Sequence, residues 1–163
     1  MTDGTKKAVL EYLRARGQSI TFAESCTGGL LAASLVDLPS ASCVLNESYV
    51  TYANEAKCAL LGVSSETLTA YGAVSMETAA EMAEGAARRA HADAAVAVSG
   101  IAGPDGATEG KPVGTVAFGF YLDGKTETRL MHFGALGRQA VREAAVQYVW
   151  DTLAELLGAE GNG

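Results

Sequence analysis

The feature of this sequence that most constrains its fold is a short apolar segment that ends in a polar, glycine-containing turn. The stretch reads Thr21-Phe22-Ala23-Glu24-Ser25-Cys26-Thr27-Gly28-Gly29. Residues 19–23 predict a buried strand, and the apolar residues 30–38 predict a helix that follows at once. A strand that turns sharply into a helix leaves backbone N–H groups free at the positive end of the helix dipole. The turn is therefore a candidate site for an anion or a developing negative charge.

The rest of the chain alternates helical and extended patterns. Helices are expected over residues 6–15, 54–62, 64–72, 76–90 and 138–157, and strands over residues 49–52, 94–98, 113–122 and 126–133. Asn54 is the expected N-cap of its helix, and Asp123-Gly124 predicts a two-residue hairpin. These patterns predict one domain over residues 1–163, an α/β fold built as a three-layer α/β/α sandwich on a mixed sheet. Residues 158–163 are expected to form a disordered tail.

Composition and charge exclude several classes of function. The chain has 163 residues, is 48% hydrophobic and carries a net charge of −7. Its basic residues are scattered, so no nucleic-acid groove is expected, and it has no apolar run long enough to cross a membrane. No signal peptide is apparent, so we expect the cytoplasm. The cysteines, Cys26, Cys43 and Cys58, lack the spacing of a metal site or disulfide framework, and we expect no metal or organic cofactor.

The scarcity of histidine narrows the chemistry that the turn can support. His91 and His132 stand apart from any polar cluster, so a Ser-His-Asp triad is not expected. If Ser25 is a nucleophile, lysine is the known substitute for the missing base. Lys57 falls in the first turn of a predicted helix, where the dipole disfavours a cation and favours the neutral amine that a general base needs. Tyr52 ends the preceding strand and can relay a proton between the two.

Other interpretations of these residues stay open at this point. Cys26 is a better intrinsic nucleophile than serine, although a buried structural cysteine fits equally well. Glu24 is either a catalytic acid or a tie that fixes the turn. Ser25 can serve only as an N-cap, Lys57 as a surface lysine and Tyr52 as a core tyrosine.

A second candidate region is the long loop over residues 99–112. It reads Ser99-Gly100-Ile101-Ala102-Gly103-Pro104-Asp105-Gly106, with Gly110-Lys111-Pro112-Val113-Gly114-Thr115 after it. Glycines at this density allow backbone N–H groups to form an anion-binding nest where an α/β sheet usually places ligands. Arg138 and Arg142 are spaced i, i+4 and share a helix face, where they either bind a phosphate or merely solvate the helix.

Taken together, these stretches resemble the C-terminal domain of the CinA family, which includes single-domain nicotinamide-nucleotide amidases. The resemblance covers about residues 10–156 and rests on Ala23-Glu24-Ser25-Cys26-Thr27-Gly28-Gly29, Val50-Thr51-Tyr52-Ala53-Asn54-Glu55-Ala56-Lys57, Gly72-Ala73-Val74-Ser75 and the glycine-rich loop. One departure stands before the last helix, where Leu136-Gly137-Arg138 replaces the family's Gly-Asp-Arg. Larger relatives also carry an N-terminal domain that has no counterpart here, so its activities are not expected.

The resemblance implies hydrolysis of nicotinamide mononucleotide to nicotinate mononucleotide and ammonia, in pyridine nucleotide recycling. The family's motif serine, tyrosine and lysine fall on Ser25, Tyr52 and Lys57. We expect substrate binding at Glu24, Thr27, Gly28, Gly29, Ser99, Gly100, Gly103, Asp105, Gly106, Lys111, Arg138 and Arg142. A homo-oligomer, dimeric or larger, is also expected. The alternative function is a regulatory module that binds a pyridine nucleotide without turning it over.

Overall fold

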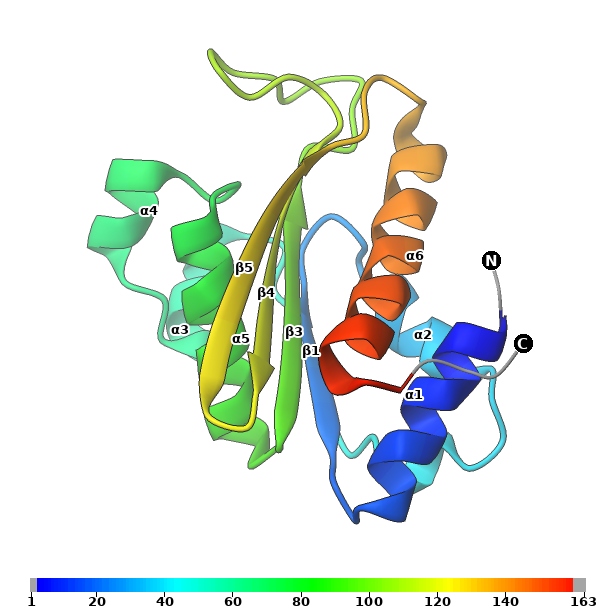
Figure 1. The fold of residues 1–163 in the computed structure, drawn as a ribbon. Coiled ribbons are helices and arrows are strands. Elements are labelled where there is room, and N and C mark those ends of the chain that lie inside the picture. The colour runs from blue at the N-terminus through cyan, green and yellow to red at the C-terminus, as the bar shows by residue number, and fades with distance from the viewer. Residues whose placement is uncertain (1–2, 160–163) are drawn as a thin grey trace.

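The structure is a computed structural model that describes residues 3–159, and it consists of helices on both faces of one sheet (Figure 1). The helices are α1 (Asp3–Ala15), α2 (Leu30–Val36), η1 (Ala41–Cys43), α3 (Asn54–Leu61), α4 (Ser65–Tyr71), α5 (Met76–Ala90) and α6 (Arg138–Leu157). The strands are β1 (Ile20–Glu24), β2 (Tyr49–Val50), β3 (Ala94–Gly100), β4 (Thr115–Leu122) and β5 (Lys125–His132).

The sheet is mixed, with strand order β2-β1-β3-β4-β5. Strand β1 runs parallel to β2 and β3, whereas β3, β4 and β5 pair antiparallel, the last two through the predicted hairpin. Helices α1, α2 and α6 cover one face, and α3, α4 and α5 cover the other (Figure 1). This arrangement confirms the predicted three-layer α/β/α fold.

The core on the α6 face is formed by large side chains. Trp150 is fully buried, packs edge-on against Phe22, and donates from Nε1 to Ser34 Oγ at 2.9 Å. The buried residues of α6 include Val146 and Trp150 as well as Val141, Val149 and Leu153. Helix α6 therefore buries a broader face than a single stripe, because it lies between the sheet, α1 and α2.

The core on the opposite face is built from small residues that bring backbones together. A Cβ placed on Gly85 of α5 would stand 1.8 Å from the carbonyl oxygen of Leu61 in α3, and one on Gly119 of β4 would stand 2.4 Å from that of Ala79. Glycine at these positions allows helix-to-helix and helix-to-strand approach at backbone contact. Helix α3 is thereby seated deeply against α5.

Several element boundaries differ from the expected ones. Helix α1 begins at Asp3 instead of residue 6, and β2 ends at Val50 rather than at residue 52. Asn54 is not the N-cap of α3. Ala53 takes that position without a side-chain hydrogen bond, so Asn54 begins the helix. Of the expected tail, Gly158 caps α6 and Ala159 is buried, while residues 160–163 lie outside the described part.

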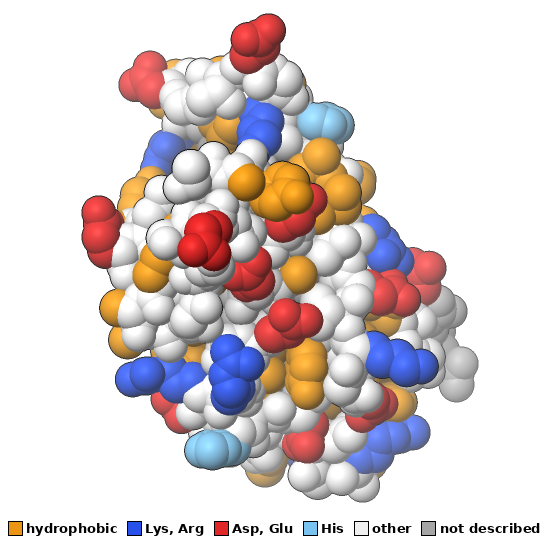
Figure 2. Space-filling model, turned by 90° about the vertical axis from the view of Figure 1, so that its left-hand side faces the viewer, with side chains coloured by type: hydrophobic (Ala, Val, Ile, Leu, Met, Phe, Trp, Pro, Cys, Tyr) orange, Lys and Arg blue, Asp and Glu red, His pale blue; other side chains and the backbone are white. Residues whose placement is uncertain are grey.

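The surface over α4 and α5 carries charges of both signs, interspersed without a continuous basic area (Figure 2). Phosphate backbones bind where Lys and Arg gather, and this face shows no broad basic area of that kind. Within residues 3–159, none of the helices is long and apolar enough to cross a bilayer.

Candidate active site

The turn after β1 is held in place by Glu24, which is completely buried. Its two carboxylate oxygens accept hydrogen bonds from the N–H groups of Leu31 and Ala32, at 2.8 and 2.9 Å. Gly29 is the N-cap of α2 and offers no side-chain acceptor, so the carboxylate of Glu24 supplies the missing cap. The carboxylate also favours the positive end of the helix dipole. Contact of Glu24 with substrate stays a prediction.

Ser25 and Lys57 meet at the end of β1. The Nζ atom of Lys57 lies 3.1 Å from Ser25 Oγ, although 32 residues separate them in sequence. Lys57 is only 1% exposed, because α3 points its side chain inward beneath the turn. The same Nζ donates to the backbone carbonyls of Thr51 at 2.9 Å and Tyr52 at 3.1 Å. The interpretation of Lys57 as a surface lysine is therefore wrong.

The surroundings of Lys57 favour its neutral form. Burial lowers the pKa of the Lys57 amine, since desolvation penalises the cation and no carboxylate among the described residues pairs with it. A neutral amine has two N–H groups, and the carbonyls of Thr51 and Tyr52 accept them. Its lone pair is then left for the proton of the Ser25 hydroxyl. This arrangement is what a lysine general base requires.

Cys26, the rival nucleophile, lies next to Ser25 but in a different environment. Its side chain joins the apolar core on the α6 side, and burial raises the pKa of its thiol to about 11. A thiol with that pKa is protonated at neutral pH and is a poor nucleophile. The geometry therefore favours Ser25.

The N–H groups of the turn differ in whether they are already bonded. The N–H of Ser25 donates to Val98 O at 2.9 Å, and that of Gly28 donates to Ser25 O at 3.1 Å. Gly28 and Gly29 both have positive φ, at 56° and 104°, so the turn needs glycine at these positions. The buried hydroxyl of Thr27 has no hydrogen-bond partner among the described residues.

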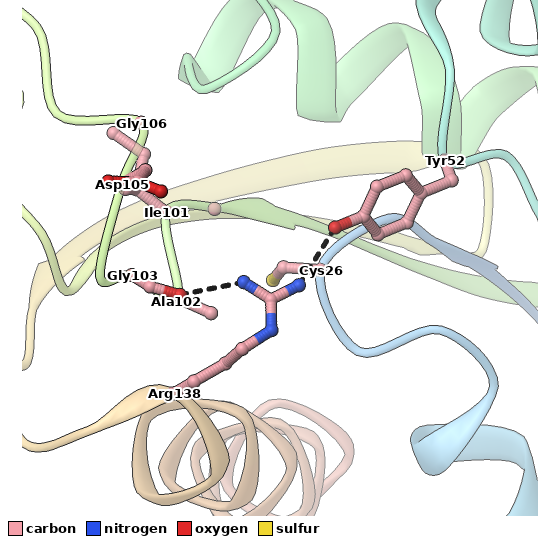
Figure 3. A pocket seen from close by; sticks show the side chains of 9 residues that line it. Cys26, Tyr52, Ile101, Ala102, Gly103, Asp105, Gly106 and Arg138 are labelled. Atoms are coloured by element: carbon pink, nitrogen blue, oxygen red, sulfur yellow. Dashed lines mark hydrogen bonds between the residues drawn. The ribbon is translucent and has the colours of Figure 1, made fainter.

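A cavity of about 270 Å³ opens beside the turn, at the carboxyl ends of β1 and β3. It is lined by Cys26, Tyr52, Gly100, Ile101, Ala102, Gly103, Asp105, Gly106 and Arg138. Figure 3 shows the Arg138 guanidinium crossing this space, from α6 toward the glycine loop and Tyr52. It donates to Gly103 O at 2.7 Å and to the Tyr52 hydroxyl at 2.9 Å.

The glycine loop closes one wall of the cavity with backbone atoms. Gly103 has a φ of 91°, and a Cβ there would stand 2.7 Å from Val113 Cγ1, so no larger residue fits without a shift. The sequence departure ahead of α6 lies across the cavity. Gly137 is the N-cap of α6 and makes no side-chain cap bond, so the helix start next to Arg138 lacks an acidic group.

The structure separates other predicted binding residues from this cavity. Arg142 donates to the carbonyls of Cys26 and Thr27, both at 3.0 Å, and to Gln139 Oε1 at 2.7 Å. Lys111 donates to Tyr71 O at 2.6 Å and lines a different cavity, of about 200 Å³, between the loop and α4. Ser99 is buried within β3 and is not among the residues lining the larger cavity.

Tyr52 is mostly exposed, with 60% of its surface accessible, so the interpretation as a core tyrosine is wrong. Its hydroxyl lies with Arg138, and its carbonyl accepts from Lys57. The expected relay through this hydroxyl stays a prediction, and the direct contact between Ser25 and Lys57 does not require it.

Thr51, Ile101 and Ala102 take part in the site without having been expected there. Thr51 orients Lys57 through its carbonyl oxygen, and the other two line the cavity. A backbone group can belong to any residue type, so the sequence does not mark these three residues as functional. The only signal was their position, next to Tyr52 for Thr51 and within the glycine loop for Ile101 and Ala102. Across residues 3–159, no cluster of His, Cys, Asp and Glu is arranged to hold a metal ion.

Comparison with known proteins gives consistent results. The model of the CinA C-terminal domain matches residues 2–157. Two relatives are named nicotinamide-nucleotide amidohydrolase PncC. The one from Escherichia coli K12 is 49% identical to this chain, and the one from Enterobacter agglomerans is 50% identical. The first alignment covers 88% of this chain and 87% of the relative, and the second 89% of each.

Other relatives are longer or known by structure. A CinA-like protein from Kosmotoga olearia is 43% identical over 95% of this chain, but the chain spans only 37% of that protein's length. A competence/damage-inducible protein from Agrobacterium tumefaciens, solved by crystallography, is 41% identical with a TM-score of 0.90 over 93% of both chains. The chain therefore belongs to the CinA C-terminal domain family.

Proposed function

We propose that this protein is an amidohydrolase that converts nicotinamide mononucleotide and water into nicotinate mononucleotide and ammonia. The observation that carries the proposal is the 3.1 Å contact between Ser25 Oγ and the buried amine of Lys57. The substrate comes from the relatives named PncC, which match this chain over nearly their whole length. A serine with a neutral lysine beside it suits acyl transfer, since the amine takes the proton that the hydroxyl must lose.

In the first half of the reaction, Ser25 Oγ attacks the carboxamide carbon while its proton passes to Lys57 Nζ. Backbone N–H groups of the turn over residues 25–29 stabilise the resulting oxyanion. The Lys57 ammonium then returns the proton to the leaving nitrogen, and the C–N bond breaks to release ammonia. An acyl ester on Ser25 remains.

In the second half, water attacks the acyl ester. Neutral Lys57 takes a proton from the water, and the ammonium returns it to Ser25 Oγ as nicotinate mononucleotide leaves. Arg138 and the glycine loop hold the ribose phosphate at the cavity, because Arg138 presents donors that Tyr52 and Gly103 do not use up. Tyr52 forms the opposite wall (Figure 3).

Ammonia release from nicotinamide mononucleotide tests this proposal directly. Wild-type protein is expected to release ammonia, and the Ser25→Ala and Lys57→Met variants are expected to release almost none. A protein that binds the nucleotide in calorimetry but releases no ammonia would instead be the regulatory module. Ammonia release from other small amides but not from the nucleotide would support amide hydrolysis at Ser25 but would rule out nicotinamide mononucleotide as the substrate.

A further inference from the structure

Arg142 was expected to bind substrate, but its hydrogen bonds lead elsewhere. Its Nε donates to Cys26 O and its NH2 group to Thr27 O, each at 3.0 Å, while NH1 donates to Gln139 Oε1 at 2.7 Å. All three nitrogens of the guanidinium are thus engaged within the protein. Two of them hold consecutive carbonyls of the turn that carries Ser25.

The hydrogen bonds from Arg142 to the Cys26 and Thr27 carbonyls fix the direction of the N–H groups in the same two peptide units, those of Thr27 and Gly28. In a trans peptide unit, the C=O of one residue and the N–H of the next point in opposite directions, and the peptide bonds of this turn are not cis. The carbonyl of Thr27 lies toward Arg142, and the N–H of Gly28 points back to Ser25 O at 3.1 Å. The carbonyl of Cys26 is held by the same guanidinium. The N–H of Thr27 is therefore directed away from α6, as that of Gly28 is.

The N–H of Thr27 has no acceptor in the part of the chain that the structure describes. It differs in this from the N–H groups of Ser25 and Gly28, which bond to Val98 O and Ser25 O. A buried, unpaired donor two residues from a nucleophile is available for a charge that exists only during reaction. Arg142 lies on the far side of the turn from Lys57, which reaches Ser25 from α3.

We propose that Arg142 is a positioning residue for the reaction, which aims the Thr27 N–H at the oxyanion by holding the Cys26 and Thr27 carbonyls. This inference rests on the proposed acyl transfer at Ser25 and assigns Arg142 a role other than substrate contact. Without the guanidinium, the Thr27 carbonyl is still held by the N–H of Leu30 at 3.0 Å, but the Cys26–Thr27 peptide unit is free to rotate. The Thr27 N–H belongs to that unit, so the donor is lost when the oxyanion forms. Binding of the ground-state amide changes little, because its neutral carbonyl gains less from that donor.

Kinetics of Arg142→Ala and Arg142→Lys test the inference. We expect kcat for ammonia release to fall about a hundredfold in Arg142→Ala, with KM nearly unchanged, since loss of one aligned oxyanion donor typically costs that much. Added guanidinium ion is expected to restore part of the rate. Arg142→Lys can reach one carbonyl and is expected to be intermediate. The pH profile keeps its midpoint because Lys57 is untouched. Arg14→Ala, which removes an exposed arginine of α1, is the matched control with wild-type kinetics.

Labelling of Ser25 by a fluorophosphonate separates failure of this inference from failure of the proposed substrate. The probe also forms an oxyanion but needs no nucleotide, so slow labelling in Arg142→Ala that guanidinium accelerates supports the inference even without ammonia release. Wild-type kcat and labelling rate in Arg142→Ala would overturn it. So would a raised KM with an unchanged kcat, which would return Arg142 to substrate binding. If Arg142→Ala does not fold, Arg142→Lys decides by the same criteria.

Discussion

The two sides of the candidate site differ in how completely their polar groups are satisfied. On the nucleophile side, Glu24 and Lys57 are buried and each makes two or more hydrogen bonds to the protein. On the loop side, Tyr52 is mostly exposed and Arg138 crosses an open cavity. Under the proposed function, one side is preorganised for the chemistry, while the other side keeps donors free for a ligand. Variants on the two sides should therefore change different kinetic constants.

The strongest test of the closed side is removal of the two groups that we propose react, Ser25 and Lys57. Ser25→Ala and Lys57→Met are each expected to reduce kcat on the order of 10⁴-fold, because nucleophile and base act as a unit. Cys26→Ala is expected to cost less than about tenfold, since its thiol, with a pKa raised to about 11, stays protonated. Steady-state ammonia release measures all three. Full activity in Ser25→Ala with loss in Cys26→Ala would assign the nucleophile to the other residue.

The pH dependence of the closed side follows from the lowered pKa of Lys57. Log kcat/KM is expected to rise by one unit per pH unit while Lys57 is protonated, and to level off below the pKa of an ordinary lysine. An activity profile that rises only near pH 10.5 would show that Lys57 is not the base.

The lowered pKa of Lys57 also makes the free energy of unfolding depend on pH. Between the lowered pKa of folded Lys57 and the ordinary value of 10.5, the unfolded chain binds the extra proton, so the free energy of unfolding rises with pH in that window. Urea unfolding of wild type and Lys57→Met at matched pH values isolates this contribution. An identical pH slope in both proteins contradicts the assignment.

On the open side, Arg138→Ala is expected to raise KM for nicotinamide mononucleotide about tenfold with little change in kcat, through loss of a charged hydrogen bond. The corresponding nucleoside, which lacks the phosphate, provides the control, and its KM should not change between the two proteins. Equal loss for both substrates would mean that Arg138 supports the cavity wall and does not bind phosphate.

Glu24 tests whether the closed side is held by hydrogen bonds to α2. Glu24→Gln keeps one acceptor oxygen and is expected to lower the free energy of unfolding by about 1 kcal/mol, and Glu24→Ala by about 2 kcal/mol. Urea denaturation at neutral pH gives both values. Unchanged stability with a raised KM would support substrate contact by Glu24.

The smallest effect is expected at Lys111, which lies against α4 rather than at the larger cavity. Lys111→Met should change KM for the nucleotide by less than about twofold, as expected for a half-buried surface side chain without substrate contact. A large rise in KM would show that the loop moves Lys111 to the ligand, and would blur the contrast between the two sides.

The fold and the candidate pair, Ser25 and Lys57, could be predicted from sequence because they depend on residue type. The apolar run of β3 and the Asp123-Gly124 turn predict a buried strand and a hairpin, and both are present. Lys57 was identified from the dipole at a helix start, although Ala53 and not Asn54 caps that helix. Lys57 binds Ser25 from across the sheet edge, a contact that spacing alone did not specify.

The roles of the arginines and of Lys111 were less accessible. Arg138 and Arg142 share one helix face by their i, i+4 spacing, yet they reach different places. Arg138 extends into the cavity and bonds to Gly103 O, whereas Arg142, one helical turn later, bonds to the turn after β1 at Cys26 O. Lys111 follows a glycine-rich loop whose path depends on contacts with α4. Such outcomes depend on tertiary packing, which local pattern does not encode.

The backbone contact between Gly85 and Leu61 makes the position of Lys57, the proposed base, depend on helix α5. A side chain at position 85 would clash with the Leu61 carbonyl, so the two helices have to separate, and any shift of α3 carries the Lys57 amine with it. A mutational scan that scores activity would thus record Gly85 as sensitive even though it touches no reacting atom. Under the proposed function, one added methyl group at this helix crossing would change the distance over which the proton passes from Ser25 to Lys57.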